Sequence, residues 1–84
     1  MKLTSAIEAS QYCDSLRREL SLVRYNPDLH KMLKNIEGMI TEISKKEVTC
    51  RRSKNFKLIE APLKTLCDSI DHLEKLILIA RLME

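Results

Sequence analysis

The chain has 84 residues, of which 15 are basic and 12 acidic, and its 44% apolar content is typical of a globular protein and not of a disordered one. One glycine and two prolines argue against sheets joined by tight turns and favour long helices. The first ten residues carry no apolar signal-peptide segment, and no apolar run approaches the roughly 18 residues of a membrane span. We therefore expect one soluble cytoplasmic domain over residues 1–84, with no membrane contact.

The three cysteines, Cys13, Cys50 and Cys67, are an odd number in a chain without an export signal. This indicates reduced thiols in a cytosolic compartment. Cys13 and Cys50 lie on apolar stripes and Cys67 borders one, so each is expected to act as a small hydrophobic side chain.

The first predicted helix covers about residues 5–25. Ser5 and Glu8 have the spacing of a capping box, in which a hydroxyl and a carboxylate satisfy amides of the first turn. Apolar residues then recur three and four positions apart, which is the period of one helix face. They are Ala6, Ala9, Cys13, Leu16, Leu20 and Val23.

The segment "RYNPDL" ends this helix and begins the next. A proline disfavours the helical region for the residue before it, and Pro27 itself suits a first helical turn. Asn26 is the expected N-cap, and Asp28 lies near the positive end of the helix dipole. This predicts a tight corner between two antiparallel helices.

The second predicted helix covers about residues 27–50, and its apolar stripe is wide enough to contact two neighbouring helices. The periodicity fades after Ile43. Residues 48–60 can therefore be a fraying helix end, an irregular segment or a small β-hairpin that pairs Val48–Arg52 with Phe56–Glu60.

The third predicted helix ends near residue 83 and begins either at about 56 or at 62, where Pro62 suits a first turn. Leu63, Leu66, Ile70, Leu73, Ile77 and Ala80 form its stripe at coiled-coil spacing. The three lengths are similar. We therefore predict an all-α fold, with three long helices in an antiparallel up-down-up bundle or an extended helical hairpin that associates into a larger bundle.

The end of this helix has more apolar residues than one stripe can hold. Leu78 and Ile79 fall outside the stripe, and exposing both would leave an apolar patch of the kind that marks contacts. We predict a protein interface there, with a homodimer as the simplest partner. Its expected residues are Leu73, Leu76, Leu78, Ile79 and Leu82. The alternative is that Met1, Leu3 and the segment around Phe56 fold over this end.

A basic cluster occupies residues 45–57, where six cations and Glu47 give a net charge of +5. It consists of Lys45, Lys46, Arg51, Arg52, Lys54 and Lys57. Such a patch can bind phosphates or an acidic partner. However, positive charge also suits a helix C-terminus, and Phe56 is the single aromatic residue nearby, which is too few for a stacking platform.

Other chemistry finds no support in the residue pattern. Asp68 and His72 share a helix face, but no cysteine or histidine spacing matches a zinc site. There is no glycine-rich phosphate loop, and no cysteine lies at helical spacing from a histidine that could activate it. We therefore expect no catalytic residue, metal, cofactor or small-molecule substrate. The leading hypothesis is a non-enzymatic adaptor, regulator or inhibitor that acts by protein–protein contact, and the alternative is a small basic nucleic-acid-binding regulator.

Overall fold

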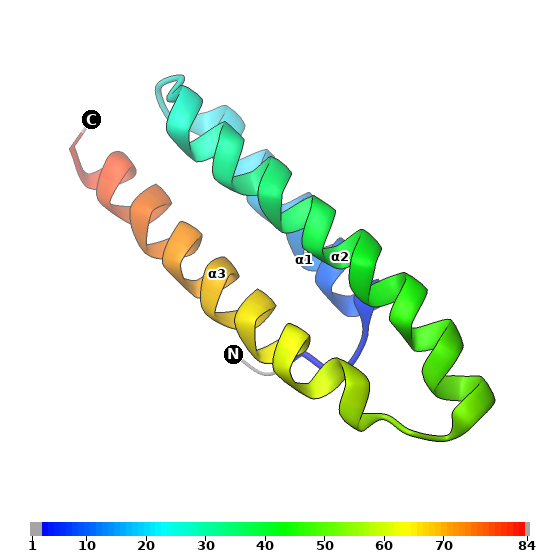
Figure 1. The fold of residues 1–84 in the computed structure, drawn as a ribbon. Helices are drawn as coiled ribbons and strands as arrows, with labels where there is room; N and C mark the ends of the chain where they lie inside the picture. The colour runs from blue at the N-terminus through cyan, green and yellow to red at the C-terminus, as the bar shows by residue number, and fades with distance from the viewer. Residues whose placement is uncertain (1–2, 84) are drawn as a thin grey trace.

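The computed structural model describes residues 3–83, which form three helices (Figure 1). These are α1 (Ala6–Leu22), α2 (Pro27–Ser53) and α3 (Lys57–Leu82). The prediction of an all-helical chain is confirmed, and residues 3–83 contain no strand.

The helices form an elongated body of 49 × 17 × 17 Å in which α2 contacts both other helices. The chain reverses direction between α1 and α2 and again between α2 and α3, so α1 and α3 run the same way (Figure 1). Direct contact between α1 and α3 is sparse. α2 therefore takes part in most of the packing between helices.

The core combines the stripes of all three helices. Its buried members from α1 and the following turn are Ala6, Ala9, Cys13, Leu16, Leu20 and Val23; those from α2 are Leu29, Leu33, Ile36 and Ile43; those from α3 are Leu66, Ile70, Leu73 and Ile77. Cys50, Ile59 and Cys67 are also buried. The three cysteines are free and buried, as the stripe positions predict.

The corner between α1 and α2 has the predicted N-cap and proline, but α1 ends earlier than predicted. The Asn26 side chain accepts a hydrogen bond from the Asp28 amide at 3.0 Å, and Pro27 is the first residue of α2. The first helix ends at Leu22 and not at Tyr25, because Val23 is already extended (ψ 164°). The extended segment spans the distance to α2, and Val23 still reaches the core.

The second corner corrects the predicted end of the second helix, agrees with the earlier of the two predicted starts of the third, and excludes the hairpin. α2 continues to Ser53, three residues beyond the expected end, and residues 57–60 are already helical. Pro62 lies inside α3, five residues after the helix begins, and not in its first turn. A proline there removes one intrahelical hydrogen bond, because it has no backbone N–H. Ile59, three residues earlier on α3, is buried.

Polar contacts on α1 hold it against α2. The Ser5 hydroxyl caps α1 by accepting from the Glu8 amide at 3.3 Å, whereas the Glu8 carboxylate bonds the Thr4 hydroxyl. The Ala6 amide donates to the Glu47 carboxylate of α2 at 2.6 Å. A side chain of the neighbouring helix α2 therefore accepts the hydrogen bond of this first-turn amide.

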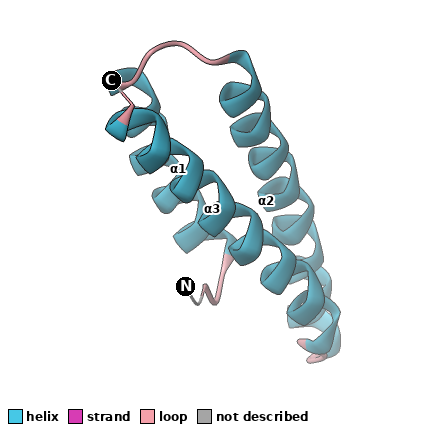
Figure 2. Cartoon of the chain, turned by 90° about the vertical axis from the view of Figure 1, so that its left-hand side faces the viewer, coloured by secondary structure: helices cyan, strands magenta, loops and turns pink. Residues whose placement is uncertain are grey.

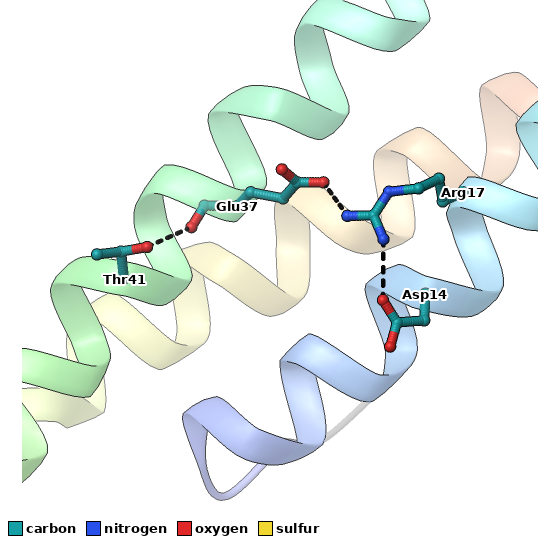
Figure 3. Close-up of polar contacts among 4 residues, drawn as sticks. All are labelled: Asp14, Arg17, Glu37 and Thr41. Carbon is teal, nitrogen blue, oxygen red and sulfur yellow. Dashed lines mark hydrogen bonds and ion pairs between the residues drawn. The ribbon is translucent and has the colours of Figure 1, made fainter.

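Arg17 links α1 to α2 on the surface (Figure 3). It pairs with Asp14 at 2.9 Å on its own helix and with Glu37 on α2. Thr41 donates to the backbone carbonyl of Glu37 at 3.1 Å. The bridge is solvent-exposed, so it orients the two helices more than it stabilises them.

Lys54 gives a test of the α2–α3 corner, because its φ of 56° is left-handed and strained for a side chain with a Cβ. Lys54→Gly should raise the free energy of unfolding by about 0.5–1 kcal/mol, as measured by urea denaturation. Ser53→Gly is the control and should lower it, because Ser53 is helical. Equal effects of the two substitutions would contradict the left-handed assignment.

Candidate protein-interaction surface

The last turns of α3 leave large apolar side chains in solvent. Leu78 is 57% exposed, Ile79 51% and Leu82 78%, and Met83 at the helix end is also exposed. These three leucine and isoleucine residues belong to the predicted interface set, and the single chain does not cover them. Large exposed apolar side chains gathered at one helix terminus are typical of a contact surface.

Two residues of that set lie elsewhere than predicted. Leu73 is 0% exposed and forms part of the core, so it offers no surface to a partner and its inclusion in the interface is corrected. Its place on the main stripe of α3, one turn before Ile77, explains this burial. Leu76 is half-buried and packs against the core with one side.

The N-terminal cover that the sequence left open as an alternative is not formed by the described residues. Leu3 packs against the core near the start of α1, and Phe56 is exposed at the start of α3. Phe56 lies in the α2–α3 connection, at the end of the molecule opposite the C-terminus (Figure 1), and the start of α1 lies beside Glu47 of α2. Met1 lies outside the described residues.

The exposed end of α3 adjoins the end of α1. The C-terminus lies at the same end of the molecule as the α1–α2 connection in both views (Figures 1 and 2), and Leu22 and Tyr25 are exposed there too. A hollow of about 390 Å³ separates α1 from α3, and Glu19, Leu78 and Arg81 are among its lining residues. Apolar and charged groups are thus mixed on this side.

Leu78 and Ile79 do not form one continuous patch. Consecutive helical residues project about 100° apart. Leu78 faces the hollow beside α1, whereas Ile79 points away from it and does not line it. A partner that contacts both residues has to wrap around the end of α3.

A second, less polar groove runs between α2 and α3. It contains a hollow of about 550 Å³ beside Gly38, Met39 and Pro62 and an adjoining hollow of about 200 Å³ beside Met32 and His72. Apart from its chain neighbours and the adjacent backbone of α2, no atom lies within 4 Å of the position that a Cβ at Gly38 would take. The bare backbone therefore leaves the groove open. Gly38 is the single glycine of the chain. Its sequence position alone does not show that it faces a groove, because that requires the position of α3.

The basic cluster lies around the corner between α2 and α3. All six of its cationic residues are exposed. Lys45 pairs with Glu42 at 3.6 Å and Arg51 with Glu47 at 3.9 Å. Glu47 is mostly buried because it also serves the first turn of α1. The structure thus brings the predicted cations to one end of the molecule, opposite the apolar end of α3.

Tyr12 and Glu74 form the polar contact between α1 and α3. A hydrogen bond from the phenol to the Glu74 carboxylate, together with burial, raises the pKa of Tyr12 to about 12. Glu74 Oε1 is buried without a hydrogen-bond partner. Glu74 also lines the hollow beside Leu78, so this buried charge sits next to the exposed apolar end.

Residues 3–83 hold few groups suited to thiol chemistry or metal binding. Burial raises the pKa of the Cys13 thiol to about 11, which disfavours the reactive thiolate. Within this part of the chain, no three histidine, cysteine or acidic side chains gather as metal ligands would. No helix of this part has the length and apolarity to cross a membrane.

The chain matches no family model, and its comparison with characterised proteins and with solved structures finds no similar protein.

The Tyr12–Glu74 contact predicts an alkaline titration that one substitution shifts. In a Tyr25→Phe background, where Tyr12 is the remaining tyrosine, ultraviolet absorbance should give a pKa of about 12, and Glu74→Gln should move it toward 10. Because the folded pKa is raised, the contact's stabilisation is present below pH 10 and is lost as pH rises through about 12. Circular dichroism over the same range verifies that the helices persist. An unchanged midpoint in Glu74→Gln would show that the carboxylate does not hold the phenol.

Proposed function

We propose that this protein is a small non-enzymatic interaction module whose three helices act as an antiparallel up-down-up bundle. The bundle associates through the C-terminal end of α3, and a homodimer is its basic form. Through this contact the module serves as an adaptor, regulator or inhibitor in the cytoplasm. No cofactor or small-molecule substrate is part of the proposal.

The observation that carries the proposal is the exposure of Leu78, Ile79 and Leu82 on a helix whose main stripe is buried or half-buried throughout. Full burial of one leucine or isoleucine contributes roughly 1.5–3 kcal/mol. A domain of this size has little net stability, so association is an effective way to gain more. A two-fold contact uses each exposed residue twice, which favours a second copy of the chain.

The proposal is tested by the solution mass of an Ile79→Glu/Leu82→Glu variant. The wild type should be dimeric by light scattering, and the variant should be monomeric with unchanged helical circular dichroism, because both side chains are exposed in the single chain. Ile7→Glu is the control, since Ile7 is an isoleucine on α1 that is more exposed than Ile79, at 66% against 51%, and its substitution should leave the dimer intact. A monomeric wild type, or a variant that loses its helices, would refute the proposed contact.

A second candidate function, nucleic-acid binding, is favoured by the six exposed cations at the α2–α3 corner. Arg51→Gln/Arg52→Gln should weaken binding of a DNA or RNA duplex in a mobility-shift assay at low salt, and rising salt should abolish the wild-type complex steeply. Arg18→Gln/Lys34→Gln removes the same charge outside the cluster and should have a much smaller effect. Absence of any wild-type complex at low salt would eliminate this candidate.

A further inference from the structure

A second coiled-coil seam runs along the exposed side of α3. The core seam, Ile59, Leu63, Leu66, Ile70, Leu73, Ile77 and Ala80, follows spacings of four and three residues and is buried or half-buried throughout. The residues one position earlier in the chain repeat the same spacing, and Met83 continues it to the end of the described chain. This second seam consists of Leu58, Pro62, Thr65, Ser69, His72, Leu76, Ile79 and Met83. Positions at this spacing share one helix face.

No member of the second seam is an acidic, lysine or arginine residue. The next face around the helix differs sharply, because five of its eight positions are charged. Those eight are Lys57, Ala61, Lys64, Asp68, Asp71, Lys75, Leu78 and Leu82. A solvated helix face normally carries charges such as these, so a seam without them over the length of α3 is suited to a neighbouring helix.

The structure leaves this seam open. Leu58, Ile79 and Met83 are exposed, and Pro62, Ser69 and Leu76 are half-buried. Pro62 and Thr65 line the larger hollow of the α2–α3 groove, and Ser69 and His72 line the smaller one. The seam and the groove together form one long surface on the face of the molecule that α1 does not cover.

The seam is complementary to itself when a second copy runs antiparallel. Such pairing places Leu58 opposite Met83, Pro62 opposite Ile79, Thr65 opposite Leu76, and Ser69 opposite His72. Exposed apolar residues then meet at both ends, and Ile79 of each copy lies over the hollow beside Pro62 of the other. The Ser69–His72 layers at the centre are polar, and a polar layer within a coiled coil specifies register.

The charges beside the seam support the same register. Asp68 and Lys75 are seven residues apart, are both exposed and lie on the same flank of the seam. In the antiparallel register, Asp68 of one copy lies level with Lys75 of the other, and the two-fold axis repeats the pair. Flanking charges of this kind set the partner and orientation of paired helices. A parallel pairing would bring neither residue to an opposite charge.

We infer that the second seam of α3 is the homodimer surface and that two copies pair antiparallel about a two-fold axis between Ser69 and His72. This inference rests on the proposed function, since it names the face and register of the self-association. It assigns Ile79 and Met83 to the dimer surface and leaves Leu78 facing α1.

Charge exchange tests the register. Asp68→Lys and Lys75→Asp should each weaken dimerisation about tenfold by sedimentation equilibrium at low ionic strength, because two attractive pairs become repulsive. The double variant should regain wild-type affinity, and an equimolar mixture of the two single variants should form a heterodimer. Lys34→Asp on α2 is the matched control for charge and should dimerise as the wild type does. Single variants that dimerise normally, or a mixture that stays as weak as its components, would overturn the inference.

Cysteine cross-linking supplies an independent readout. Mildly oxidised Thr65→Cys mixed with Leu76→Cys should give a disulfide dimer, whereas Thr65→Cys alone should not, because its two copies are about 16 Å apart along the axis. The native cysteines are buried in the core. A disulfide in Thr65→Cys alone would indicate parallel pairing.

The outcomes separate the two proposals. A wild-type monomer at all concentrations would refute both the proposed self-association and its register. A wild-type dimer that ignores both the charge exchange and the cross-linking pattern would refute the second seam alone.

Discussion

The fold depends on the burial of one apolar stripe from each helix against the other two, with α2 making most of the contact. α2 is the helix whose stripe is wide enough for two neighbours, and both α1 and α3 use it as their main partner. This arrangement leaves α1 and α3 with little direct contact. As a consequence, α3 is bordered by a hollow of mixed apolar and charged residues on the α1 side and by an open, mostly apolar groove on the α2 side.

The small size of the chain explains why one face of the α2–α3 pair stays uncovered. A chain of this length buries only about 60–65% of the surface of its unfolded state, so few side chains can be covered on every side. α1 is the shortest helix, at 17 residues against 27 and 26, and it covers one face of the longer pair. The opposite face of the α2–α3 pair has no fourth helix to cover it, and the bare backbone at Gly38 deepens the groove there. A second copy that supplies this missing helix would complete a common type of helical bundle.

Much of the fold could be predicted from local sequence signals. The stripe spacing identified the buried residues of α1 and α3 with few errors, and Asn26 and Pro27 placed the start of α2 correctly. The corner at residues 54–56 could not be predicted in the same way. Lys54 adopts a left-handed conformation without being glycine, and Pro62 is tolerated inside a helix, and both choices oppose local preference. Packing of the long α2–α3 pair outweighs these local costs.

The candidate surface was likewise only partly predictable. The sequence by itself determined that the end of α3 carries more apolar residues than one stripe can bury, because spacing and composition are properties of the chain alone. The sequence also determined the positions of the second seam, since these follow from the same spacing of residues along the helix. Tertiary structure decided that Leu78 faces α1 and that the seam borders an open groove. The physical reason is that exposure depends on where neighbouring helices lie, and those positions are set by packing between residues far apart in the chain.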